Sequence, residues 1–318
     1  ISSIARLARY QAIEPSGMQT TRLRIPSTRI RVPEPCSRNC GGTGPEAHGG
    51  LGGGALEQMI LMEEAGRALL LEPVCETVFQ AGWLLAQAGG ALAEDLLGQV
   101  ASGAVKLAVA LGEPAMRYDL ADIATRATRD GAGWRIDGAK AVVMAAPWAD
   151  RLIVAARTGG QAGDAQGLSL FVVDPAAAGV TLHPYPTIDG RRAADIDFAD
   201  VAVAAEALIG PEGGALPLLE AMRDRAIAAQ AAEAAGLLDK LVADTVDYTK
   251  QRQQFGQPIS SFQVLQHRMV DMFMRVEMVR SAAILASLKL DGDPAERAKA
   301  ASAAKVTVAE ACRFIGQN

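Results

Sequence analysis

The period of the hydrophobic pattern changes twice along this chain, and these two changes restrict the fold more than any other feature. Between residues 55 and 103 the apolar residues recur at helical spacing, in runs such as ALEQMILMEEAGRALLL and LAEDLLGQVASG. From Val105 to about residue 203, seven short β-rich runs alternate with Gly, Asp and Pro turns. This second pattern is typical of an antiparallel sandwich or barrel. After Ile209 the helical spacing returns.

Three long helices are predicted after residue 209. Gly256 to Pro258 separate the first from the second, and the second begins after Ser260 and Ser261, which are N-cap residue types. The third has Asp293 as its predicted cap and Pro294 at its first position. It reaches the last residue without a C-cap glycine, so we expect the natural protein to continue further.

The resulting prediction is an α+β multi-domain fold. We expect an N-terminal helical domain (45–104), a central antiparallel β-barrel or sandwich (105–208) and a truncated C-terminal helical bundle (209–318). Residues 1–44 do not fit, because they are rich in Arg, Ser, Thr and Pro and show neither helical nor strand periodicity. We expect either a disordered arm or an out-of-frame translation there.

Composition argues against several classes of function. The net charge is −5 and no basic block is present, so we expect no nucleic-acid partner. No apolar run is long enough to cross a bilayer and no signal-peptide pattern is found, which predicts a cytoplasmic protein without a membrane partner. Cys75 and Cys312 lie in apolar helical contexts, and no second Cys/His pair follows Cys36 and Cys40. We therefore expect reduced cysteines and no metal site.

The stretch RQQFGQPISSFQVLQHRM (252–269) is more specific than a packing helix requires. It combines an arginine, a Phe-Gly turn and a glutamine-rich segment that runs into a helix. The guanidinium of Arg252 could bind paired phosphate oxygens, because its fork matches their geometry. Alternatively, Arg252 is a solvated cation at a helix C-terminus, where it is favourable to the helix dipole.

This stretch resembles the signature RxxFGxPIxxFQxxxxxLADM of the acyl-CoA dehydrogenase family. LGEP (111–114) and DGAKAVVMAA (137–146) are similar to the family segments TEP and NGxKxWITN. VDYTKQRQQFG, DGRRAADIDF and LIGPEGGALP look most like the pimeloyl-CoA dehydrogenase small-subunit group. The resemblance implies an FAD-dependent enzyme that oxidises an acyl-CoA thioester to a trans-2-enoyl-CoA. It also implies that electrons pass to electron-transfer flavoprotein, within a homo-tetramer or a hetero-tetramer with a larger acyl-CoA dehydrogenase subunit.

The resemblance divides the expected cofactor residues into two groups. In the first group, Arg252 is expected to bind the FAD pyrophosphate of a neighbouring subunit, with Phe255 beside the adenosine and Gln254 and Gln263 as further contacts. The second group comprises residues at the family's flavin-facing positions, namely Gly112, Tyr118, Val143 and Met144.

The second group lacks the Thr and Ser hydroxyls that the family usually has. Backbone N–H groups of Val143 and Met144 are still expected to contact the flavin, because backbone donors do not depend on the side chain. Tyr118 is a candidate replacement hydroxyl. The same losses fit an alternative function, in which the chain is a non-catalytic, flavin-poor partner subunit of a hetero-oligomer.

The reaction also needs a carboxylate to remove the proton next to the thioester. In most of the family this carboxylate follows the third C-terminal helix, beyond residue 318. In the isovaleryl and long-chain groups it precedes an arginine on the first helix. That position is Asp224 here, followed by Arg225, which the resemblance assigns to the acyl-CoA site. Asp224 is shorter than a glutamate by one C–C bond, and its alternative role is in a surface charge cluster with Arg223 and Arg225. We therefore expect the chain alone to be inactive.

Overall fold

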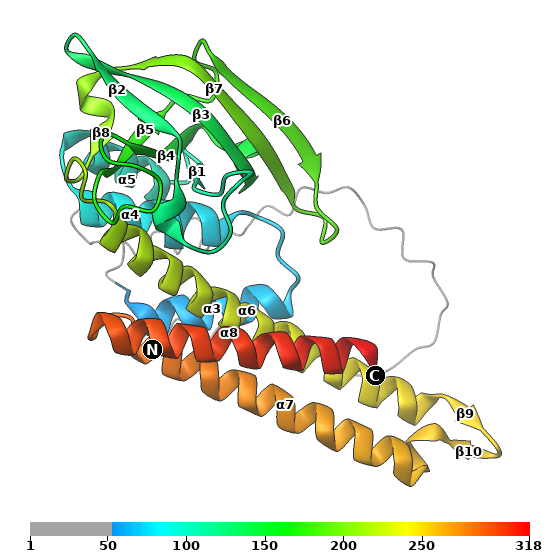
Figure 1. Cartoon of the computed structure of the whole chain (residues 1–318). Coiled ribbons are helices and arrows are strands. Elements are labelled where there is room, and N and C mark those ends of the chain that lie inside the picture. The colour runs from blue at the N-terminus through cyan, green and yellow to red at the C-terminus, as the bar shows by residue number, and fades with distance from the viewer. Residues whose placement is uncertain (1–52) are drawn as a thin grey trace. The chain divides into compact units, whose positions relative to one another are not determined.

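Helices, a sheet and a bundle of long helices follow one another along residues 53–318, the part of the chain that this computed structural model describes (Figure 1). All of these residues belong to one unit of the chain, Pro33–Asn318. The expectations for residues 1–44, with those for Cys36 and Cys40, fall outside the described residues.

The N-terminal part of the described chain consists of three α-helices and one π-helix, which follows the first of them along the chain. The elements are α3 (Ala55–Arg67), the π-helix η2 (Cys75–Gly82), α4 (Trp83–Ala88) and α5 (Ala91–Ala101). A π-helix of this length is uncommon, and such segments are frequent at functional sites. Cys75 lies in η2, where it is a buried free thiol, and burial raises its pKa.

The central region is a sandwich-like sheet of eight strands, as predicted. Its strands are β1 (Leu107–Ala110), β2 (Arg126–Asp130), β3 (Gly133–Met144), β4 (Arg151–Arg157), β5 (Leu168–Val173), β6 (Val180–Pro186), β7 (Arg192–Val203) and β8 (Leu208–Ile209). The order is β6-β7-β3-β2-β4-β5-β8, with β1 beside β4. The sheet is not antiparallel throughout, contrary to the prediction, because β1 and β2 both pair with β4 in parallel. Parallel strands cannot be joined by a tight turn and need a long crossover connection. In this sheet, β2 and β3 lie in the segment that connects β1 to β4.

Three long helices complete the described chain: α6 (Leu216–Gln251), α7 (Gln263–Leu288) and α8 (Pro294–Gln317). A small hairpin of β9 (Gln253–Gln254) and β10 (Gln257–Pro258) joins α6 to α7. The predicted cap of α8 is confirmed, since Asp293 accepts hydrogen bonds from the N–H groups of Ala295 and Glu296. The predicted Ser260/Ser261 cap of α7 was wrong. Those serines form a 3-10 turn, and Phe262 is the N-cap.

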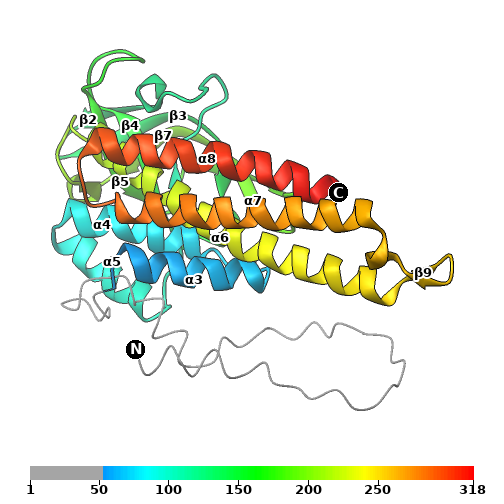
Figure 2. The ribbon, with the colours of Figure 1, turned by 90° about the horizontal axis from the view of Figure 1, so that it is seen from below.

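The helices pack through small residues. Figures 1 and 2 show α7 and α8 alongside α6, and the core between these helices includes Ala235, Val276 and Ala311. Helix α3 crosses α6 so closely that a Cβ on Gly66 would clash with the carbonyl oxygen of Glu233. A Cβ on Gly236 would clash in the same way with the carbonyl oxygen of Glu63. The alanine-rich and glycine-containing composition of α6 therefore allows this close crossing.

Candidate active site

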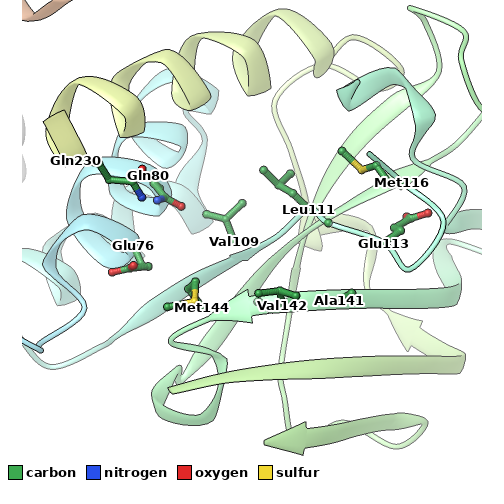
Figure 3. A pocket seen from close by; sticks show the side chains of 12 residues that line it. Glu76, Gln80, Val109, Leu111, Glu113, Met116, Ala141, Val142, Met144 and Gln230 are labelled. Carbon is green, nitrogen blue, oxygen red and sulfur yellow. The ribbon is translucent and has the colours of Figure 1, made fainter. Parts of the chain in front are cut away.

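A pocket of about 360 Å³ lies where the sheet meets the helices (Figure 3). Its β side is formed by the end of β1, the loop that follows it and the end of β3. Its helical side is formed by η2 and α6. The lining residues are Glu76, Gln80, Val109, Leu111, Gly112, Glu113, Met116, Ala141, Val142, Val143, Met144 and Gln230. The pocket therefore brings together Gly112, Val143 and Met144, three of the predicted cofactor residues.

A buried ion pair fixes the loop after β1 against β3. The Nζ atom of Lys140 lies 2.7 Å from Oε1 of Glu113 and 3.2 Å from the carbonyl oxygen of Leu111. Burial lowers the pKa of Lys140 to about 8, although Glu113 opposes this shift. Burial also opposes ionisation of Glu113, but Lys140 and two backbone N–H groups lower the pKa of that carboxyl overall. This buried pair holds together the LGEP and DGAKAVVMAA segments.

The same two segments approach each other closely at Gly112. The N–H of Ala141 donates to the carbonyl oxygen of Gly112 at 2.7 Å. A Cβ at position 112 would lie 2.9 Å from the carbonyl oxygen of Ala141, closer than side chains tolerate. Gly112 is therefore needed for the two pocket-forming segments to meet.

A bulge in β3 shapes the next part of the wall. The register with β7 shifts between Lys140 and Val143, and the intervening Val142 has a φ of 54°. A β-branched residue in this left-handed region is strained. Asp195 supports the strained turn, because its Oδ1 accepts hydrogen bonds from the N–H of Val142 at 2.8 Å and from the hydroxyl of Tyr185 at 2.9 Å. The Val142 N–H and Tyr185 both lower the pKa of Asp195.

A charged network lies beside the pocket on its helical side. Arg191, at the turn before β7, contacts Glu233 of α6 and Glu76 of η2, with 3.6 Å between Nη1 and the Glu76 carboxylate. Asp189 adds a third carboxylate, whose Oδ2 lies 3.6 Å from Nε of Arg191. Burial raises the pKa values of Glu76 and Glu233, against the effect of Arg191. Glu76 borders both the network and the pocket.

Asp224 and Arg225 do not line the pocket. Asp224 is only 2% exposed, and its carboxylate accepts from Arg297 of α8 at 3.0 Å and from Arg223. The alternative of an exposed surface cluster was therefore wrong, because Asp224 is buried in an ion pair between helices. Arg225 points elsewhere, donating to Gln58 and Asp291.

The hairpin residues form a second group, separate from the pocket. Arg252, Gln254, Phe255 and Gln263 are all exposed, at the far end of α6 and α7 from the sheet (Figure 1). Phe255 is 90% exposed, and its ring meets the Phe262 ring edge-on. Within residues 53–318, the Arg252 guanidinium has neither an ion-pair partner nor a hydrogen-bond acceptor.

Tyr118, the candidate replacement hydroxyl, lies outside the pocket. The residue is 93% exposed and does not line the pocket, so its hydroxyl is not part of this site. Glu76, Gln80 and Gln230 line the pocket although no motif in the sequence indicates them. The only available signal was the spacing of four between Glu76 and Gln80, which places both on one face of a helix but does not distinguish a pocket wall from a solvated surface.

Two negative findings apply to the described residues. Among the helices of residues 53–318, none has both the length and the apolar character needed to cross a membrane. In that same range, no group of three His, Cys, Asp or Glu side chains is arranged to hold a metal ion.

Comparison with known proteins identifies the family. The acyl-CoA dehydrogenase middle domain matches residues 108–201, and the acyl-CoA dehydrogenase C-terminal domain matches residues 221–318. The acyl-CoA dehydrogenase FadE12 of Mycobacterium tuberculosis is 31% identical over 274 residues, covering 84% of this chain and 70% of FadE12.

Solved structures agree with this sequence match. Butyryl-CoA dehydrogenase from Megasphaera elsdenii is 26% identical with a TM-score of 0.82, over 88% of this chain and 75% of that chain. A variant of a steroid ACAD is 31% identical with a TM-score of 0.75, over 91% of this chain and 79% of that chain. With the sandwich-like sheet, the long C-terminal helices and the pocket between them, this chain belongs to the acyl-CoA dehydrogenase family.

Proposed function

We propose that the chain is an FAD-dependent acyl-CoA dehydrogenase subunit whose cofactor site is divided between its pocket and the β9–β10 hairpin of a neighbouring subunit. The observation that carries this proposal is the separation of the two groups of predicted cofactor residues. Gly112, Val143 and Met144 line the pocket, whereas Arg252 and Phe255 lie exposed at the end of α6 that is far from the sheet. Two subunits are needed for both groups to contact one cofactor.

The residues of the pocket fit a flavin ring. The walls formed by Val109, Leu111, Val143 and Met144 are apolar, and the backbone of the strained β3 bulge offers donors and acceptors independently of side-chain type. Asp195 and the Lys140–Glu113 pair hold these backbone segments in position. When bound, FAD would accept the hydride from the β carbon of the acyl chain.

The hairpin fits the phosphate end of the cofactor. The Arg252 guanidinium is exposed and carries a permanent charge, so it can form paired hydrogen bonds to a pyrophosphate. The exposed Phe255 ring offers an apolar face for an adenosine. Gln254 and Gln263 are also exposed and can add hydrogen bonds.

An apolar stripe on α7 is an argument for contact with a neighbouring subunit. The stripe consists of exposed large apolar side chains that share one helical face: Val270, Phe273, Met274, Met278, Ile284, Leu285 and Leu288. Large exposed apolar side chains that gather on one helical face are typical of protein interfaces. We propose that it binds a second subunit, either a copy of this chain or a larger family member, and that electron-transfer flavoprotein is the electron acceptor.

A second candidate function is a flavin-poor partner subunit without catalysis of its own. It is favoured by the position of Asp224, whose carboxylate is bound by Arg297 and Arg223 and does not line the pocket. In that case the hairpin would still contribute Arg252 to the cofactor of the partner.

The two functions differ in a spectroscopic experiment. The protein is purified alone and after co-expression with a large acyl-CoA dehydrogenase subunit, reconstituted with FAD, and mixed with acyl-CoA without oxygen. After co-expression, the proposal expects flavin in this chain's own pocket in addition to that of the large subunit, and bleaching of the flavin absorbance by acyl-CoA. Flavin present only in proportion to the large subunit would support the second function. Bound flavin that no acyl-CoA reduces in either preparation would contradict both.

A further inference from the structure

We infer that the acyl chain of the substrate carries an uncharged hydrogen-bonding group, a hydroxyl or a carbonyl, which Gln80 and Gln230 recognise on the helical side of the pocket. This inference rests on the proposed acyl-CoA dehydrogenase function and specifies its substrate class. It follows from two observations, namely the amides that line this side and the excess of carboxylates next to them.

The helical side differs in chemistry from the rest of the pocket. The β side is mostly apolar, whereas η2 and α6 contribute the amides of Gln80 and Gln230 (Figure 3). The Gln80 amide makes one long contact, 3.7 Å to the Cys75 sulfur, which is a weak acceptor. Within the described part of the chain, no acceptor or donor contacts the Gln230 amide. Each amide can both donate and accept, so together they match a hydroxyl or a carbonyl.

An unsubstituted acyl chain matches this wall poorly. A saturated chain would displace water from both amides without replacing the lost hydrogen bonds. Such loss is the reason that polar sites discriminate against substrates lacking the matching group.

A terminal carboxylate matches the wall poorly for a different reason. Glu76 lies on the same side of the pocket, and it shares its only cation, Arg191, with Glu233 and Asp189. Three carboxylates already share this one arginine, and the residues that line the pocket include no Lys or Arg. A terminal carboxylate would therefore lose hydration there without gaining an ion-pair partner. A pimeloyl-type chain, which ends in a carboxylate, is therefore disfavoured.

The test measures binding rather than turnover. Dissociation constants are determined by calorimetry for the flavin-reconstituted full chain and three acyl-CoA thioesters of equal length: unsubstituted, terminally hydroxylated and terminally carboxylated. We expect the hydroxylated thioester to bind about five- to tenfold more tightly than the unsubstituted one, and the carboxylated one to bind most weakly. Gln80→Leu and Gln230→Leu should each reduce this preference. Gln87→Leu is the matched control, since Gln87 is exposed on the adjoining α4 and does not line the pocket.

The outcomes separate this inference from the proposed function. Preference for the hydroxylated thioester that is lost in Gln230→Leu, an exposed position where folding is not at risk, supports the inference. Equal binding of all three thioesters, or tightest binding of the carboxylated one, overturns it and leaves the acyl-CoA dehydrogenase function intact. Absence of binding by any thioester contradicts the proposed function itself, and the inference with it.

Discussion

Asp224 and Asp244 lie on the same helix, α6, but only Asp224 is buried with its cationic partner. Asp224→Ala would leave Arg297 without its buried carboxylate, so we expect a loss of about 3–5 kcal/mol in the free energy of unfolding. Asp244→Ala is the matched control, because its ion pair with Lys240 is exposed and should contribute at most about 0.5 kcal/mol. Urea denaturation measures both values. Equal stability of the two variants would show that Asp224 is free for another role, including proton abstraction.

Glu76 should make stability depend on pH. Burial raises the pKa of Glu76 in the folded protein, so the unfolded chain ionises at lower pH than the folded one. Increasing pH above the unfolded value of about 4.3 therefore favours unfolding until the folded pKa is passed. Glu76→Gln lacks this titration, and Arg191 keeps two carboxylates in the variant.

We therefore expect Glu76→Gln to gain stability relative to the wild type as the pH rises above the unfolded value of about 4.3. The free energy of unfolding is measured as a function of pH, with the exposed Glu206→Gln as the control for loss of one charge. If the stability difference between Glu76→Gln and the wild type stays constant or falls with increasing pH, burial does not raise the pKa of the Glu76 carboxyl.

Places in the pocket could be predicted from the sequence only where a motif indicated them. The LGEP and DGAKAVVMAA segments indicated Gly112, Val143 and Met144, and all three line the pocket. The burial of Asp224 could not be predicted, because its partner Arg297 lies on a different helix, 73 residues further along the chain. Glu76 and Gln80 were missed because a π-helix changes which side chains face the sheet, and the hydrophobic pattern contains no sign of that change.

The crossing of α3 and α6 depends on two glycines. In Gly66→Ala the new methyl group would collide with the backbone of Glu233, which cannot move without shifting the helix. We expect a loss of about 1–3 kcal/mol, and a similar loss for Gly236→Ala. Gly98→Ala on α5 is the matched control. A Cβ there meets nothing within 4 Å, so better helix propensity should stabilise it by up to about 1 kcal/mol. Equal thermal denaturation midpoints for Gly66→Ala and Gly98→Ala would contradict the close crossing.

Secondary structure was the level that the sequence predicted best. The change of hydrophobic period located the strands β1 to β7 and the three long helices, because alternation and helical spacing are local properties. The parallel pairing of β1 with β4 was missed, since pairing partners depend on contacts between residues that are distant in the chain. The N-cap of α7 was missed because the two serines are part of a 3-10 turn rather than the helix.

At the scale of the whole molecule, the apolar stripe on α7 should determine assembly. Met278→Glu places a charge in the middle of the stripe, so we expect a smaller particle by light scattering coupled to gel filtration, with intact helical content. Ser302→Glu is the control, since Ser302 is exposed on α8 outside the stripe. An unchanged particle mass for Met278→Glu, at concentrations where the wild type is oligomeric, would mean that another surface forms the interface.

The measurement that tests the divided cofactor site most directly is a mixing experiment between two defective variants. Arg252→Ala removes the proposed phosphate contact but keeps the pocket, whereas Ala141→Phe fills the pocket but keeps the hairpin. Each variant is expected to retain little FAD alone, because a charge-assisted contact to phosphate contributes about 1.5–3 kcal/mol and a filled pocket excludes the ring. After unfolding and refolding together, mixed oligomers should combine an intact pocket with an intact hairpin from the other subunit. The account predicts that the mixture binds clearly more FAD per chain than either variant alone. A flavin content equal to the average of the two variants, in mixtures shown to contain mixed oligomers, would contradict it.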